Sequence, residues 1–159
     1  MKAIGIRAEN GKIHWAIVEG DAKNPVLVED GKFNPPESYD LTETAKWIQT
    51  RICDIVGRHK PAVCNLRTAE TFLVRKPNPK QQAGSLARAR FEGMVIASLA
   101  INGVEVSIGQ IQQMKSRVGS KQVKAYVEEK ELRGMDLSKC PKIRCEAVLA
   151  AVAALGEFE

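Results

Sequence analysis

The first third of the sequence constrains the fold most, because short apolar or alternating runs are separated there by turn residues. Residues 3–8 are apolar, and residues 12–19 alternate so that Ile13, Trp15 and Ile17 share one face. Asn10-Gly11 between the two runs favours a tight hairpin turn, since both residues tolerate positive φ angles. A third run at residues 25–29 follows another turn. The opening of the chain therefore predicts an antiparallel three-stranded meander.

Helical and strand-like segments alternate in the remainder. Asp40 and Glu43 have the spacing of a capping box at the start of the first helical pattern. The predicted helices cover residues 40–56, 84–100, 120–132 and 141–155, and the predicted later strands cover residues 62–67 and 104–108. Residues 72–82 are predicted to form an exposed basic loop.

This element order resembles the ribonuclease H-like fold. We therefore expect an α/β protein with a mixed five-stranded sheet, in which three antiparallel strands are followed by parallel crossovers, flanked by helices. The length of 159 residues favours a single domain over residues 1–159.

Charge and aromatic content narrow the possible partners. Lys and Arg number 24 against 19 Asp and Glu, which gives a net charge of +5. This excess suits nucleic acid or another anion, but it suits a solvated basic surface equally well. Aromatic residues make up only 5%, so stacking on unpaired bases has little support, and Trp15 and Trp47 are predicted to lie in the core.

The cysteines, histidines and N-terminal residues suggest neither a metal site nor export. No CxxC pair is present, and His14 and His59 have no partner at ligand spacing. We expect the four cysteines to be small buried hydrophobes in a reducing cytoplasm, without disulfides. No apolar run approaches the roughly 20 residues of a membrane span. We therefore expect a cytoplasmic protein with no bound metal and no membrane contact.

Three segments resemble RuvC-type Holliday junction resolvases. They are residues 4–6 (IGI), 86–93 (LARARFEG) and 113–123 (QMKSRVGSKQV). The resemblance covers most of the chain and implies a ribonuclease H-like fold, a DNA substrate, a homodimer and four carboxylates around Mg²⁺.

The positions that should carry those four carboxylates hold mostly other residues. They are Arg7, Asn65, Ile143 and Glu146, so one acid in four remains. A guanidinium repels Mg²⁺ and has no lone pair to donate, and one carboxylate cannot organise two metal ions. The resemblance therefore predicts a pseudo-nuclease with a degenerate site and no cofactor. Mg²⁺ returns only if relocated acids such as Glu9, Glu19 and Glu70 replace the missing ones.

Two interpretations of this site stay open. Arg7, Asn65, Arg67 and Glu146 could converge on one cleft whose guanidinium groups hold a phosphate or carboxylate. Alternatively, Arg7 and Glu146 form an internal ion pair without a ligand, because buried charges in proteins are usually paired.

Basic residues suggest two DNA contacts, and in each case a solvated basic face is the alternative. Lys115 and Lys121 match positions where the resemblance implies contacts with the DNA backbone, and Arg117 and Lys124 add charge beside them. The members of the second cluster are Arg75, Lys76, Lys80, Arg88 and Arg90.

The predicted function is non-catalytic binding of duplex or branched DNA through its backbone phosphates. One alternative is a scaffold protein without nucleic-acid binding, whose apolar final helix supplies an interface. Another is a metal-dependent nuclease with relocated acidic residues.

Overall fold

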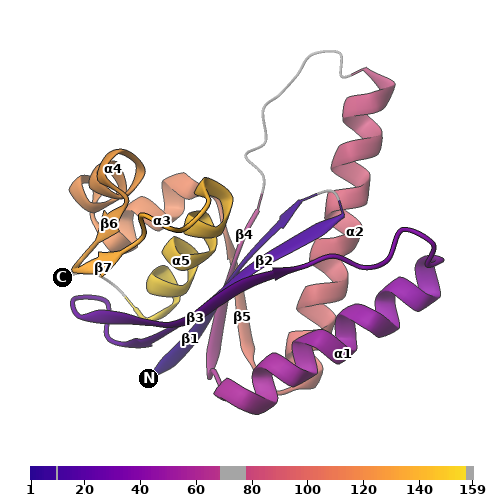
Figure 1. Ribbon diagram of the computed structural model, residues 1–159, viewed down its shortest axis with the longest axis horizontal. Helices are drawn as coiled ribbons and strands as arrows, with labels where there is room; N and C mark the ends of the chain where they lie inside the picture. Colours follow the sequence, from indigo (N-terminus) through magenta and orange to yellow (C-terminus); the bar gives the residue numbers. More distant parts are fainter. Residues whose placement is uncertain (10, 69–77, 157–159) are drawn as a thin grey trace.

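Five strands form one mixed sheet in the computed structural model, which describes residues 1–9, 11–68 and 78–156 (Figure 1). The strands are β1 Lys2–Glu9, β2 Lys12–Gly20, β3 Pro25–Phe33, β4 Val63–Arg67 and β5 Glu105–Gly109. Their order across the sheet is β3-β2-β1-β4-β5. The pairs β1–β2 and β2–β3 are antiparallel, whereas β1–β4 and β4–β5 are parallel. The predicted sheet, with its meander and parallel crossovers, is confirmed.

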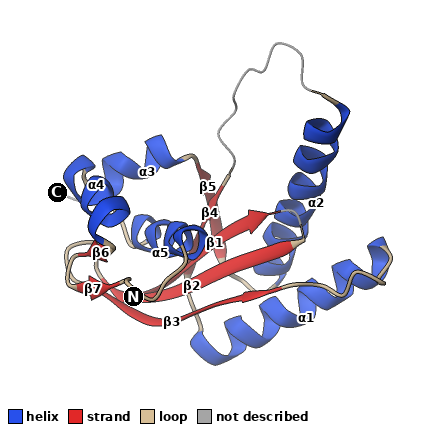
Figure 2. Ribbon diagram, turned by 45° about the horizontal axis from the view of Figure 1, so that its top comes forward, coloured by secondary structure: helices blue, strands red, loops and turns tan. Residues whose placement is uncertain are grey.

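Helices cover both faces of this sheet (Figures 1 and 2). They are α1 Leu41–His59, α2 Pro79–Ile101, α3 Ile111–Val118, α4 Ser120–Glu129 and α5 Lys142–Ala154. Helices α1 and α2 pack on one face, and α5 packs on the other against β1, β2 and β4. Helices α3 and α4 lie beside α5, together with a small hairpin of β6 (Glu131–Leu132) and β7 (Met135–Asp136).

Side chains of different size fill the two faces. Ile13, Trp15 and Ile17 point together toward α1 and α2, as the alternation predicts, and pack on large apolar residues of both helices. Ala3, Ala16 and other small residues face α5. At Gly5 of β1 the approach is closest, because a Cβ atom there would lie 1.9 Å from the carbonyl oxygen of Ala147. The helix backbone therefore rests directly on the strand.

Capping boxes fix the starts of α1 and α2. The Asp40 carboxylate accepts the backbone N–H of Glu43, and the Glu43 carboxylate accepts that of Asp40, as the spacing predicts for α1. Asn78 and Gln81 form the same reciprocal pair at the start of α2. Helix α2 therefore begins at Pro79, so the prediction of a loop through residue 82 is wrong; the rest of that segment, 72–77, lies outside the described residues.

The segment before α5 also differs from the prediction. Residues 110–118, for which no helix was predicted, include helix α3. Helix α4 ends at Glu129, because Lys130 adopts a left-handed conformation with φ of 50°. Arg133 and Gly134 both have positive φ and form the turn between β6 and β7, as a tight hairpin requires.

The cysteines follow the prediction at three of four positions. Cys64, Cys140 and Cys145 are buried, whereas Cys53 is exposed on α1, and all four are free thiols. The prediction that all four are buried is therefore wrong at Cys53, because this residue lies on the side of α1 turned away from the sheet. No described helix has both the length and the apolar character needed to cross a membrane.

Candidate functional site

Two arginines lie side by side where parallel strands β1 and β4 end. Arg7 of β1 is the register partner of Arg67 of β4, so both side chains leave the same face of the sheet. That face is covered by α5, whose second turn carries Glu146. The close approach of α5 at Gly5 brings this carboxylate to the level of the strand ends.

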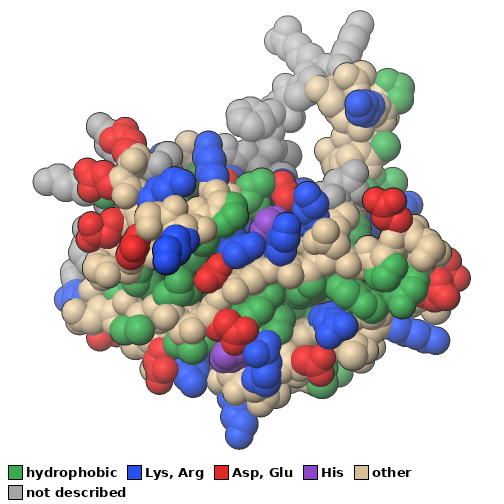
Figure 3. Space-filling view, in the orientation of Figure 1, with side chains coloured by type: hydrophobic (Ala, Val, Ile, Leu, Met, Phe, Trp, Pro, Cys, Tyr) green, Lys and Arg blue, Asp and Glu red, His purple; other side chains and the backbone are tan. Residues whose placement is uncertain are grey.

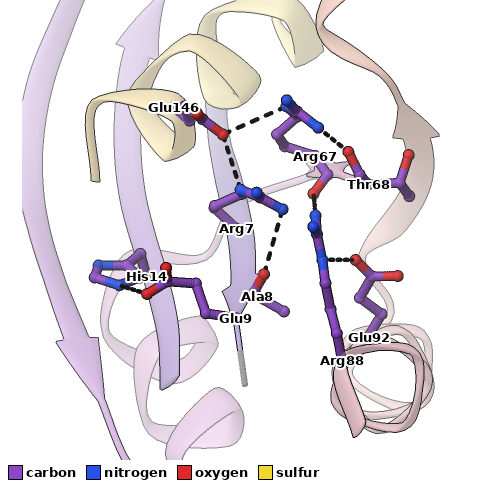
Figure 4. A network of polar contacts seen from close by, with 9 residues as sticks. All are labelled: Arg7, Ala8, Glu9, His14, Arg67, Thr68, Arg88, Glu92 and Glu146. Atoms are coloured by element: carbon purple, nitrogen blue, oxygen red, sulfur yellow. Dashed lines mark hydrogen bonds and ion pairs between the residues drawn. The ribbon is translucent and has the colours of Figure 1, made fainter. Parts of the chain in front are cut away.

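One carboxylate oxygen holds both guanidinium groups (Figure 4). The Nε atom of Arg7 lies 2.8 Å from Oε2 of Glu146, and the Nε atom of Arg67 lies 3.4 Å from the same oxygen. All three side chains are largely buried, with exposed fractions of 14%, 8% and 16% for Arg7, Arg67 and Glu146. Two guanidinium groups therefore share one carboxylate oxygen in a weakly screened setting, where electrostatic interactions are strong.

Backbone carbonyls hold the two guanidinium groups, and α2 holds the backbone of Arg67. Arg7 donates to the carbonyl of Ala8 at 3.4 Å, and Arg67 donates to the carbonyl of Thr68. Arg88 of α2 donates to the carbonyl of Arg67 at 3.3 Å and pairs with Glu92 at 2.9 Å (Figure 4). Arg88, predicted as part of the second basic cluster, thus ties α2 to the end of β4.

Asn65 lies on the same face of β4 but opens onto a neighbouring cavity. It is 3% exposed, and its Oδ1 atom has no hydrogen-bond partner among the described residues. This cavity has a volume of about 510 Å³ and is also lined by Gln113 and Arg117 of α3. A predicted site position and a predicted DNA-contact residue therefore share one cavity that offers an acceptor and a cation.

Among the other predicted DNA-contact residues, those with described side chains do not line this cavity. Lys115 is half-buried on α3, while Lys121 and Lys124 belong to α4 with side chains outside the described part of the structure. Lys80 and Arg90 are exposed on α2, and Arg75 and Lys76 lie outside the described residues.

A basic row across the sheet was missed by the sequence analysis. His14 is the register partner of Arg7, and Lys32 is the register partner of His14. Arg67, Arg7, His14 and Lys32 therefore occupy one row over four adjacent strands, and His14 also contacts Glu9 at 3.1 Å. Only the register between strands could have revealed this row, and periodicity within one strand does not give that register.

The four predicted metal-site positions and Arg67 do not supply a ligand shell for Mg²⁺. Magnesium requires a shell of oxygen ligands, but Arg7, Asn65, Arg67 and Glu146 supply one carboxylate and one amide oxygen beside two cations. Ile143 of α5 supplies none. Of the candidate relocated acids, Glu9 contacts His14, Glu19 pairs with Lys2 at the opposite end of β1, and Glu70 lies outside the described residues. Within the described ranges, no three His, Cys, Asp or Glu residues gather as a metal site.

Sequence comparison and structural comparison give different results. No model of a protein family matches this sequence, and no curated protein matches it either. Thermus thermophilus RuvC in complex with Holliday junction substrate matches with a TM-score of 0.73 at 15% identity, over 96% of this chain and 91% of that chain. A second structure of that RuvC gives a TM-score of 0.72 at 17% identity, over 96% and 92% of the two chains.

A structure from yeast also matches this chain. The crystal structure of the yeast mitochondrial Holliday junction resolvase gives a TM-score of 0.61 at 11% identity, over 96% of this chain and 77% of that chain. These matches agree with the strand order and the helix placement described above. The chain therefore has the RuvC-like form of the ribonuclease H-like fold.

Proposed function

We propose that this chain binds nucleic acid through its backbone phosphates and does not hydrolyse it. The observation that carries the proposal is the convergence of the Arg7 and Arg67 guanidinium groups on one oxygen of Glu146. A phosphate oxygen can accept hydrogen bonds from the same two guanidinium groups, whereas a site built to hold Mg²⁺ would present carboxylates.

The surroundings of the pair support a phosphate ligand. The net charge is +5, and Arg117 lines the cavity beside Asn65 on the same side of the sheet. A protein of this fold, T. thermophilus RuvC, is seen in complex with a Holliday junction substrate. Duplex or branched DNA is therefore the class of ligand to test first.

The apolar final helix does not favour the scaffold alternative. Eight residues of α5 are buried in the core, namely Cys145 and residues 147–153. Its apolar surface is therefore already covered by the sheet and by α3, and it is not free for a partner.

Salt dependence tests the phosphate contacts. Fluorescence anisotropy with a labelled duplex and a four-way junction should give affinities that fall steeply between low and physiological salt. Arg117→Ala should weaken binding several-fold and reduce the slope of log K against log salt by about 0.9, the value for one lost phosphate contact on duplex DNA. Lys46→Ala is the matched control, since Lys46 is an exposed cation on α1 over the opposite face. Absence of binding to both DNAs at low salt would overturn the proposal.

Incubation of the same DNAs with Mg²⁺ or Mn²⁺ tests the second half of the proposal. We expect intact DNA with either metal. Cleavage by the wild-type chain that Glu146→Gln abolishes would show instead that the site is a nuclease.

A further inference from the structure

A groove between β3 and α1 combines aromatic rings with cations. Its cavity measures about 710 Å³, within the range of sites that hold small organic ligands. The residues that matter are Trp15, Lys32, Phe33, Trp47, Arg51 and Arg58. Figure 3 shows a band of hydrophobic side chains flanked by Lys and Arg where Figure 1 shows β3 passing α1. This groove lies on the α1 side of the sheet, away from Glu146.

The aromatic rings of the groove are held in fixed positions. The chain contains two Trp, two Tyr and four Phe, and both Trp and one Phe line this groove. Phe33 meets Trp47 edge to face at 5.5 Å, and the Arg51 guanidinium lies 5.2 Å from the centre of the Trp47 ring. Trp15 is packed under the backbone of Gly31. A planar ligand would find a preformed stacking surface of indole and guanidinium.

The charge of the groove selects an anionic ligand. Lys32, Arg51 and Arg58 face a single acid in the lining, Asp54. Arg51 lies 3.8 Å from Asp54, and Arg58 shares Glu29 with His59. No ion pair of Lys32 is found within the described residues. A flat ring that carries a negative charge, as a nucleotide does, fits this combination better than a neutral aromatic compound.

The groove and the basic row lie on opposite faces of the sheet and meet at the edge strand β3. Lys32 lines the groove and is also the register partner of His14, which pairs with Arg7. Neighbouring strands lie about 4.8 Å apart, so the row from Arg67 to Lys32 spans about 14 Å. One nucleic-acid strand can therefore contact the two arginines and reach the groove around the edge strand β3.

We infer that the groove binds an unpaired nucleobase of a nucleic-acid strand, with the base on Trp47 and Arg51 and an adjoining phosphate at Lys32. The inference rests on the proposed function and extends it from backbone contacts to unpaired nucleotides. Stacking of this kind is tolerant of base identity, so no sequence preference follows.

Intrinsic fluorescence tests the inference directly, because both tryptophans of the chain line the groove. Titration with a 12-nucleotide oligothymidylate should quench the emission and saturate. A blunt 12-base-pair duplex, whose binding is followed by anisotropy, should leave the emission unchanged. Free thymidine monophosphate at the same nucleotide concentration should quench much less. It has only its own phosphate and lacks the phosphates of neighbouring nucleotides, which would contact the basic row.

Variants separate the groove from the duplex contacts. Arg51→Ala should weaken oligothymidylate binding about tenfold and duplex binding less than twofold. Arg51 is suitable because its side chain is 52% exposed, so its loss does not threaten folding. Trp47→Ala should give at least the same loss, and Lys46→Ala, which removes a neighbouring cation outside the groove, should change both affinities equally little.

The outcomes distinguish the two proposals. Salt-sensitive duplex binding without quenching by oligothymidylate, or with equal effects of Arg51→Ala on both DNAs, would overturn the groove inference and leave the proposed function standing. Equal quenching by the free nucleotide would overturn the assignment to a nucleic-acid strand. Failure to bind any DNA would overturn both.

Discussion

The two faces of the main sheet are built from side chains of opposite size. Toward α5 the strands present Ala3, Gly5 and Ala16, and several alanines of the helix pack against them. Toward α1 and α2 they present large aliphatic and aromatic side chains such as Ile17 and Trp15.

This difference in size places the two candidate sites. Small residues let α5 approach closely enough for Glu146 to bond Arg7 at 2.8 Å. On the other face large side chains separate α1 from the edge strand β3, and the groove with Trp47 opens there. The size of the packed side chains therefore determines that the Glu146 cluster forms on the α5 face and that the groove forms on the α1 face.

The largest expected effect comes from adding volume on the close-packed face. Gly5→Val should prevent folding, because its Cβ would lie 1.9 Å from one α5 backbone atom and 2.3 Å from another. Circular dichroism in native buffer should show loss of structure. Gly93→Ala, with nothing within 4 Å of the new Cβ on α2, should fold and equal or exceed the wild type in stability. A folded Gly5→Val would mean that α5 is not seated on β1.

Removing volume on the other face should cost less. Ile52→Ala should lower the free energy of unfolding by about 4 kcal/mol, since a fully buried side chain leaves a cavity between α1 and the sheet. Urea denaturation measures the loss. Ile101→Ala, at a position 72% exposed, is the control and should change stability little. Similar losses in the two variants would contradict the placement of this core.

Next in size is the loss of the shared carboxylate. Glu146→Gln should lower the free energy of unfolding by about 3 kcal/mol, because two largely buried guanidinium groups lose their counter-charge. Inorganic phosphate should restore part of the thermal stability by occupying the anion position. Glu128→Gln, at an exposed position of α4, should behave like the wild type with and without phosphate. A stability unchanged by Glu146→Gln would show that the pair contributes nothing to the fold.

The smallest effect should have the opposite sign. The hydroxyl of Tyr126 is buried beside α5 without a hydrogen-bond partner among the described residues, and burial raises its pKa well above the ordinary value. Tyr126→Phe should therefore stabilise the chain by about 1 kcal/mol, as relief of an unpaired polar group. Thermal unfolding against Tyr39→Phe, at an exposed position, gives the comparison. A destabilised Tyr126→Phe would reveal a partner for the hydroxyl.

Local patterns in the sequence were sufficient for most of the sheet and for α1 and α5. Turn residues separate the strands, and the Asp40–Glu43 capping box is a local signal that the structure retains. The signal at Asn78 and Gln81 is of the same kind but uses the less common pair of amides, and α2 was therefore predicted to begin too late. The hairpin of β6 and β7 is too short to produce an alternating pattern.

The candidate site divides in the same way. The meeting of Arg7 with Glu146 could be anticipated, because the fold order brings the first strand under the last helix. The role of Arg88 as a tie between α2 and Arg67 depends on how far the helix extends toward the strand end, which no local pattern specifies. The groove was missed for a related reason, since Trp47 and Phe33 meet only through the packing of α1 on β3.

The Arg88 contact links the position of helix α2 to the site formed by Arg7, Arg67 and Glu146. Its guanidinium contacts the carbonyl of Arg67 with one nitrogen and Glu92 with another, so one side chain joins the strand end to the helix. A displacement of α2 would therefore shift the backbone of Arg67, and a phosphate bound at Arg67, as proposed above, would act on α2 in return. A partner that binds along α2 would therefore be coupled to the phosphate proposed at Arg67.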